Sequence, residues 1–343
     1  MHFKTVSSPH QAATQQVGGV MRQVLYALVP GTAAAFWFFG WGVLINVVLA
    51  ITFALAFEAS MLRVRARPVR PALTDYSAVV TAWLLALALP PLAPWWLVLM
   101  GMFWAIVVAK HLYGGLGYNP FNPAMVGYVA LLVSVPAYMT RWLPPGMLAQ
   151  YPLDLLQSLQ VVFAGQLPAN LSWDMVTMAT PLDTVKTQIG LSQTISEIRE
   201  NPLFGDFSGK GWEWIANCFA LGGLWLVYKR IIPWQIPLAM LLGLGVPAGV
   251  FYLSNPDYFA SPAFHIFSGG AILGAFFIAT DPVSGSATPL GRIVFAVGVG
   301  VLTFVIRTWG GYPDGIAFAV LLMNMTVPLL DQYTQPRVFG REH

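Results

Sequence analysis

Ten long apolar stretches constrain the fold of this chain more than any other feature of its sequence. Each approaches the roughly 20 residues that an α-helix needs to cross the hydrocarbon core of a bilayer. Only 9% of the residues are charged, whereas soluble proteins carry about 25%. We therefore predict an all-α polytopic membrane protein with about ten transmembrane helices. The stretches lie at about 24–40, 42–62, 73–90, 94–111, 122–140, 214–229, 232–252, 264–280, 292–307 and 314–331.

Lysine and arginine residues are distributed unevenly between the two predicted sides of the membrane. If the N-terminus is cytoplasmic, 12 of the 17 basic residues fall on the inner side. Basic residues concentrate in the cytoplasmic loops of membrane proteins. The sequence therefore predicts that both termini are cytoplasmic and that the long polar segment 141–212 lies on the opposite side.

This polar segment divides the chain into two membrane halves. Five stretches precede it, so the second half enters the membrane from the side opposite to the first. Two inverted five-helix halves are a common arrangement in transporters. The predicted parts are a cytoplasmic N-terminal segment 1–23, a first half 24–140, a periplasmic loop 141–212, a second half 213–331 and a cytoplasmic tail 332–343.

Several classes of site are excluded by composition. Cys218 is the single cysteine, which rules out an intrachain disulfide and an iron–sulfur cluster or Cys-type zinc site built from this chain alone. The sequence has no P-loop, no GxGxxG and no HExxH pattern. Its net charge of +3 comes from residues flanking the apolar stretches, so we predict no nucleic-acid partner.

Three stretches interrupt the apolar pattern at the predicted inner face: 73–81, 114–124 and 279–286. Irregular backbone at membrane depth persists where it is buried in protein or lines a cavity, so these breaks predict a cofactor or ion site. Ordinary loops with helix caps, such as Thr74 or Asp75 as an N-cap and Pro282 as a stop, are the alternative. The candidate site residues are Asp75, Asn119, Asn122 and Asp281.

Other ionisable residues near the stretches have simpler explanations. Glu58 lies one to two turns before Arg63 and Arg65, which predicts a pairing at the inner interface. Lys110 and His111 end the fourth stretch, and we expect both side chains to extend toward the interface.

The polar segment contains the string Asp-Met-Val-Thr-Met-Ala-Thr-Pro-Leu at 174–182. One interpretation is a helix start with Thr177 as the N-cap. The other is flavin attachment. Cysteine and histidine are both missing from 141–212, so a flavin would be joined through a threonine hydroxyl, as a phosphoester that leaves the ring's redox chemistry unchanged. Lys186 would then partly neutralise the phosphate. Further on, 187–200 predicts one short amphipathic helix.

Asp174, Thr177, Ala179 and Thr180 resemble the signal at which bacterial flavin transferases esterify FMN to the last threonine. The chain departs from that signal at Met175 and Met178, where glycines are usual. Other segments, in order along nearly the whole chain, resemble the D subunit of the Rnf electron-transport complex and the related B subunit of the sodium-pumping NADH:quinone oxidoreductase. These segments are 7–10, 73–81, 117–124 and 279–284.

The resemblance implies a subunit of a bacterial inner-membrane complex that couples electron transfer between ferredoxin and NAD to Na⁺ or H⁺ movement. It implies FMN on Thr180, attached by a flavin transferase, and a non-covalent riboflavin in the membrane part. Iron–sulfur and flavin subunits would be partners, and the isolated chain would be inactive as an oxidoreductase. Asp75 or Asp281 would hold a cation. Thr288, in a second Ala-Thr-Pro-Leu string, is one residue out of register and on the wrong side.

Two interpretations from other classes stay open. Ten spans in two inverted halves also suit a small-solute channel or secondary transporter without a redox cofactor. A structural subunit that scaffolds flavin-bearing partners is the third. Covalent flavin distinguishes the first interpretation from both.

Overall fold

The computed structural model describes residues 17–336 and is helical throughout, with one isolated bridge between Phe204 and Gly209. The predicted terminal segments 1–23 and 332–343 lie partly outside these residues, and the resembling segment 7–10 lies entirely outside them. The first half contains α1 (Val17–Phe39), α2 (Trp41–Val64), α3 (Val69–Leu73), α4 (Ser77–Ala88), α5 (Trp95–Met102), the π-helix η1 (Phe103–His111), α6 (Pro123–Ser134) and α7 (Pro136–Met139).

The second half follows a segment of four short helices. These are α8 (Leu155–Ala164), α9 (Trp173–Val176), α10 (Pro181–Gly190) and α11 (Ile195–Arg199). The helices after them are α12 (Trp212–Tyr228), α13 (Gln235–Ser254), α14 (Pro262–Phe267), α15 (Ala271–Leu273), the π-helix η2 (Gly274–Ile278), α16 (Pro289–Trp309) and α17 (Ile316–Tyr333).

Helices occupy each of the ten predicted apolar ranges. Four of them, α2, α13, α16 and α17, are long and apolar enough to cross a membrane by length and composition. The other ranges hold shorter, less apolar or interrupted helices. Helix α1 begins at Val17, inside the segment that was predicted to precede the first span. A polytopic membrane protein accounts for this pattern, and the number of ten crossings stays a prediction.

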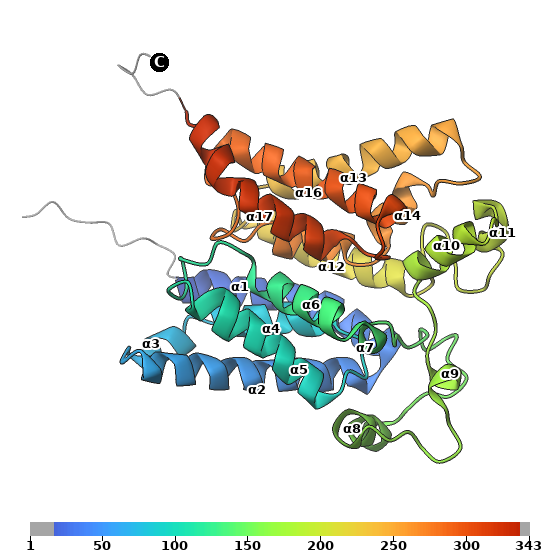
Figure 1. Cartoon of the computed structure of the whole chain (residues 1–343), viewed down its shortest axis with the longest axis horizontal. Helices are drawn as coiled ribbons and strands as arrows, with labels where there is room; N and C mark the ends of the chain where they lie inside the picture. Colours follow the sequence, from blue (N-terminus) through green and yellow to red (C-terminus); the bar gives the residue numbers. More distant parts are fainter. Residues whose placement is uncertain (1–16, 337–343) are drawn as a thin grey trace, which may run out of the picture.

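The two halves pack against each other through matching helices (Figure 1). The first helices of the halves, α1 and α12, are in contact, and so are the last, α6 and α17. Helices α1 and α12 run antiparallel, because Phe39 at the end of α1 lies 4.9 Å from Trp212 at the start of α12, ring centre to ring centre. Gly222 permits this approach, since a Cβ there would lie 1.9 Å from the Ala27 carbonyl oxygen.

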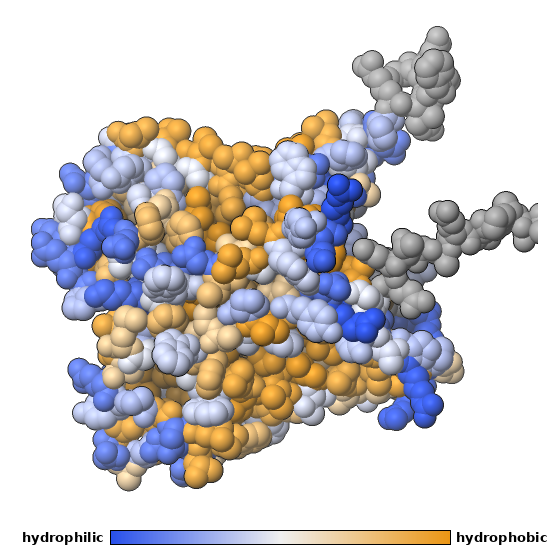
Figure 2. Space-filling view, turned by 180° about the vertical axis from the view of Figure 1, so that it is seen from behind, coloured by the Kyte–Doolittle hydropathy of each residue, from blue (hydrophilic) through white to orange (hydrophobic). Residues whose placement is uncertain are grey.

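A broad apolar surface covers the face of the bundle that is seen from behind the view of Figure 1. Figure 2 shows it between two more hydrophilic ends, one of which carries α8–α11. Many large apolar side chains of the bundle are exposed, among them Trp37 at 80% and Leu253 at 83%, and large contiguous apolar patches are rare on soluble monomers. The surface therefore fits a protein that is embedded in lipid.

The segment α8–α11 forms a small layer on one end of the bundle (Figure 1). Leu182 and Val185 of α10 share an apolar cluster with Phe264 of α14, which fixes this part of the layer to the second half. Helix α8 instead contacts α2, and its Val161 clusters with Leu92 of the first half. The prediction of one helix over 187–200 is wrong. Helix α10 ends at Gly190, Ser192 takes a positive φ of 66°, and a new helix begins after the Thr194 N-cap.

Candidate functional site

Thr180 begins helix α10. It is the N-cap residue, its Oγ1 accepts a hydrogen bond from the Asp183 backbone N–H at 3.3 Å, and Pro181 occupies the first helical position. Thr177 instead follows α9, and its hydroxyl donates to the Trp173 carbonyl at 2.8 Å. The interpretation of Thr177 as an N-cap is therefore wrong, and a helix start at this string belongs to Thr180.

The rest of the predicted attachment motif is accessible. Asp174 and Ala179 are exposed, and Thr177 and Thr180 are half-buried. The Met178 backbone N–H donates to the Trp142 carbonyl at 2.9 Å, which holds the string against the segment that follows α7. A modifying enzyme could reach this string without unfolding the bundle.

Thr180 lies at the edge of a cavity of about 400 Å³ between the two halves, which we call the loop-side cavity. This volume is within the usual range for sites that bind small molecules and cofactors. Polar and aromatic side chains line part of it, and aliphatic side chains form most of the rest. Its lining includes Phe39, Tyr128, Trp142, Thr180, Asp183, Trp212, Tyr312 and Asp314.

Three aromatic rings form one wall of the loop-side cavity. Trp142 and Trp212 lie 5.1 Å apart, ring centre to ring centre, and Phe39 contacts both, at 6.0 and 4.9 Å respectively. Large rings supply apolar area for a planar aromatic ligand and lose little conformational freedom when it binds. A half-buried threonine hydroxyl beside such a wall suits a tethered aromatic cofactor.

Lys186 does not point to the N-terminus of α10. Its Nζ donates to the backbone carbonyls of Arg307 at 3.1 Å, Tyr312 at 3.2 Å and Ile306 at 3.5 Å. The expectation that Lys186 neutralises a phosphate on Thr180 therefore has no support in the geometry. Burial lowers the pKa of Lys186, and burial raises the pKa of Asp183, while each opposes the other's shift through its charge.

An ion pair between Arg307 and Asp314 lies beside the loop-side cavity. The Arg307 Nε and Nη2 donate to Asp314 Oδ1 at 3.2 and 3.1 Å, and the Gly270 N–H donates to Asp314 Oδ2 at 2.9 Å. Arg307 is 1% exposed and Asp314 is 25% exposed, toward the cavity. Sequence reasoning missed this pair, although an arginine inside an apolar run was a signal for one.

A second cavity, of about 660 Å³, lies between the halves at the other end, and we call it the distal cavity. Three of the four predicted residues, Asn119, Asn122 and Asp281, line it together with Ser77 and Lys110. All three breaks therefore contribute residues to one cavity, and a cofactor or ion site there stays a prediction.

Asp75, the fourth predicted residue, does not line the distal cavity. Its Oδ1 accepts from the Ser77 N–H at 2.7 Å and from the Ser77 hydroxyl at 2.6 Å. Asp75 therefore contacts Ser77, which lines the cavity, and it stabilises the start of α4.

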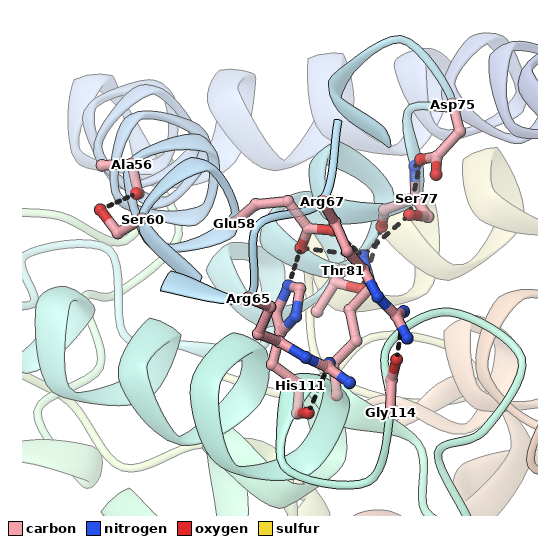
Figure 3. A network of polar contacts seen from close by, with 11 residues as sticks. Ala56, Glu58, Ser60, Arg65, Arg67, Asp75, Ser77, Thr81, His111 and Gly114 are labelled. Atoms are coloured by element: carbon pink, nitrogen blue, oxygen red, sulfur yellow. Dashed lines mark hydrogen bonds and ion pairs between the residues drawn. The ribbon is translucent and has the colours of Figure 1, made fainter. Parts of the chain in front are cut away.

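Glu58 pairs with Lys110 and His111, which corrects the predicted pairing with Arg63 and Arg65. Lys110 Nζ lies 2.9 Å from each Glu58 carboxylate oxygen and 3.0 Å from the Ser77 hydroxyl, and His111 Nε2 lies 3.1 Å from Glu58 Oε2. The Lys110 side chain is 2% exposed, so it does not extend to the interface. Figure 3 shows this network, in which Asp75 and Ser77 adjoin the pair.

Asn324 of α17 joins the two halves at the distal cavity. Its Oδ1 accepts from the Asn122 N–H at 3.1 Å, and its Nδ2 donates to the Ser284 carbonyl at 2.9 Å. The Ser284 hydroxyl in turn donates to Asp281 Oδ2 at 2.7 Å. One amide therefore ties the break before α6 to the break after η2.

Five helical elements, α1, α4, α6, α12 and η2, contribute residues to both cavities. In α4, Leu84 borders the distal cavity and Ala86 the loop-side cavity, and in α6 the neighbours Ala124 and Met125 are divided in the same way. The separation differs between helices, from neighbouring residues in α6 to eleven residues in α1, where Val24 borders the distal cavity and Ala35 the loop-side cavity. Among residues 17–336, no cluster of three or more His, Cys, Asp or Glu side chains is placed to hold a metal ion.

An all-helical bundle with an apolar surface and two internal cavities defines a polytopic membrane protein with sites between its halves. The chain belongs to the NQR2, RnfD, RnfE family, which it matches over residues 4–340. It is 54% identical to the D subunit of the ion-translocating oxidoreductase complex of Alcanivorax borkumensis, over 100% of this chain and 98% of the relative. Proteins of the same name from Vibrio cholerae and Escherichia fergusonii are 51% and 46% identical, over 99% of this chain and at least 99% of each relative.

Proposed function

We propose that this chain is the flavin-bearing D subunit of an ion-translocating oxidoreductase complex of the Rnf type. In this proposal it passes electrons through FMN esterified to Thr180, and the transfer is coupled to Na⁺ or H⁺ movement between ferredoxin- and NAD-linked partners. Support comes from relatives that carry this subunit name along their full length. The observation that carries the FMN assignment is the place of Thr180 at the edge of the loop-side cavity.

The start of α10 suits a phosphoester. Pro181 lacks a backbone N–H, and the next two N–H groups, of Leu182 and Asp183, have no backbone partner within the helix. The Asp183 N–H already donates to the Thr180 hydroxyl oxygen. The N-terminus of a ten-residue helix attracts a negative charge through these N–H groups and the helix dipole. In this proposal the N-terminus of α10, and not Lys186, partly neutralises the charge of the phosphate.

The residues around the cavity would hold the ring of the cofactor. When bound, the isoalloxazine ring supplies one- and two-electron redox chemistry. Trp142, Trp212 and Phe39 offer an apolar wall that excludes water from it, and the Arg307–Asp314 pair adds fixed charges nearby.

We further propose that the distal cavity holds riboflavin or the coupling ion. Asn119 and Asn122 are buried amides at its edge, and Asp281 supplies a carboxylate. Asp75 acts there through Ser77. The cavity volume and its mixture of polar and apolar groups agree with a cofactor site.

The membrane arrangement is part of the proposal. Ten crossings of a bacterial inner membrane, with both termini cytoplasmic and 141–212 periplasmic, agree with the basic residues and the apolar surface. Partners are the iron–sulfur and flavin subunits and a flavin transferase. Because Cys218 is the single cysteine, the chain holds no cluster of its own and is inactive as an isolated oxidoreductase.

A small-solute channel or secondary transporter is the second candidate. Two cavities at opposite ends of the interface between the halves favour it. Its residues would carry no flavin.

Denaturing gels of the purified protein under ultraviolet light test the proposal. Wild type, Thr180→Ala and Thr187→Ala are expressed in a host with an active flavin transferase, and Thr187 is an exposed threonine on the same helix. We expect a fluorescent full-length band in wild type and Thr187→Ala and a dark band in Thr180→Ala. A dark wild-type band overturns the proposal in favour of a transporter or a scaffold.

A further inference from the structure

The side chain of Lys186 connects helix α10 to the end of helix α16. Its ammonium group donates to three backbone carbonyls, two from the last turn of α16 and one from the turn that follows. An ammonium group has three N–H donors and no acceptor, so these contacts use all of them. Lys186 is half-buried in this position.

The receiving carbonyls belong to a helix end that needs donors. The last four carbonyls of a helix lack partners within the helix, and the end carries a partial negative charge. Gly310 supplies one N–H to Ile306 at 2.9 Å. Lys186 supplies donors and a positive charge from outside the helix, which stabilises both partners.

The other contacts of α10 are less directional. Leu182 and Val185 pack in an apolar cluster with Ile195, Ile198 and Phe264. Apolar packing holds the helix on the bundle, but it depends mainly on buried area. The three hydrogen bonds of Lys186 specify the rotation of α10 about its axis and its position along α16.

Thr180 follows the movement of Lys186 because both belong to the same helical element. Lys186 is six residues after Thr180, which is roughly 9 Å along a helix that rises 1.5 Å per residue. The end of α16 is fixed in turn, since the Arg307 side chain bonds Asp314 and the Ser268 carbonyl. Asp314 lines the loop-side cavity, so the connection runs from Lys186 to the cavity wall.

We propose that Lys186 is a positioning residue that sets how Thr180 faces the loop-side cavity. The inference rests on the proposed function, since it concerns a flavin that Thr180 carries. The Lys186 ammonium group is bound at the end of α16, and Lys186 lies more than one helical turn from Thr180, so we expect attachment to survive its loss. What changes is how firmly the attached group is held in the cavity.

The experiment uses the assembled complex with wild type, Lys186→Met, Lys186→Arg and Lys210→Met. Lys210 lies in the same segment, and no side-chain hydrogen bond from it is found among residues 17–336. In-gel fluorescence measures attachment. Quenching of the flavin fluorescence by acrylamide measures exposure of the ring, and acrylamide is neutral, so the loss of a lysine charge does not change its local concentration.

We expect all four proteins to keep the fluorescent band. In Lys186→Met the equilibrium between docked and undocked α10 shifts by about tenfold or more toward undocking, because hydrogen bonds from a charged donor stabilise by that factor. Quenching therefore rises in Lys186→Met, the flavin midpoint potential moves toward that of the free cofactor, and Lys186→Arg restores both at least in part. Lys210→Met behaves as wild type.

Unchanged quenching and potential in a fluorescent Lys186→Met overturn the inference and leave the proposed function standing. A dark wild-type band overturns the proposed function itself. If Lys186→Met does not assemble, Lys186→Gln, which keeps two donors, decides: intermediate quenching supports the inference, and wild-type quenching overturns it.

Discussion

Lys110 and Arg307 are buried cations at matching places in the two halves, each in the last turn of the fourth long helical element. Lys110 ends η1 and pairs with Glu58, whereas Arg307 lies near the end of α16 and pairs with Asp314. Their side chains are 2% and 1% exposed. One lies at the distal cavity and the other beside the loop-side cavity, so each end of the bundle contains one compensated charge.

Removal of one partner at the distal end leaves a charge buried without compensation. We expect Glu58→Gln to lower the free energy of unfolding by roughly 3–5 kcal/mol, the usual effect of breaking a buried pair. Thermal unfolding in detergent measures it. Because Lys110→Met with Glu58→Gln removes both charges, the double variant should be more stable than Glu58→Gln alone. A double variant that loses the sum of the two single losses would contradict this account.

At the loop-side end, Asp314→Asn leaves the Arg307 guanidinium without a carboxylate. A positive charge stabilises a reduced, more negative flavin. If Thr180 carries FMN, its midpoint potential should therefore rise in Asp314→Asn. Redox titration of the purified complex measures it, with Asp257→Asn as an exposed control. A potential that falls or stays constant would show that this pair does not influence the cofactor.

The docking of α10 should depend on pH through Asp183. Burial raises the pKa of Asp183, against the opposing charge of Lys186. The folded state then binds the proton more tightly, so the stabilisation is fully present below the ordinary aspartate pKa and is lost as pH rises through the raised value. A phosphoester on Thr180 adds negative charge, which raises the pKa of Asp183 further and extends the stabilised pH range upward. The positive charge of Arg307 near the cavity acts in the opposite direction.

Acrylamide quenching of the flavin measured against pH tests this dependence. We expect quenching to increase with pH just above the ordinary aspartate range in wild type, and to stay flat in Asp183→Asn. The same transition in Asp183→Asn would assign it to another group.

Asn324 holds two breaks of the helical pattern together. Asn324→Leu leaves the Asn122 N–H and the Ser284 carbonyl without these partners, which costs about 1–3 kcal/mol for buried groups. We expect a lower melting temperature and less riboflavin after purification, measured by calorimetry and by chromatography of released flavin. Asn324→Asp keeps the acceptor and loses the donor, so its effect should differ between the two breaks. A stable Asn324→Leu variant that retains all of its riboflavin would show that the Asn324 amide does not support the riboflavin site.

The sequence predicted the helical ranges well because hydropathy depends on composition along the chain. It also brought together Asn119, Asn122 and Asp281, since each lies in a break at the same predicted face. The partners of Glu58 were missed for a physical reason. A charged residue at a helix end is compatible with an interface or with a buried pair, and the packing of α2 against η1 decides between them. The same holds for Lys186, whose carbonyl partners lie 120 to 126 residues away in the chain.

The apolar partition between the cavities makes the two compartments electrically dependent. Ala124 and Met125 are neighbours in α6, yet they face different cavities. Apolar side chains screen an electric field far less than water does. If one compartment takes up an electron or a cation, the added charge therefore changes the electric potential in the other, and the bundle would link the two occupancies through this field without any helix having to move.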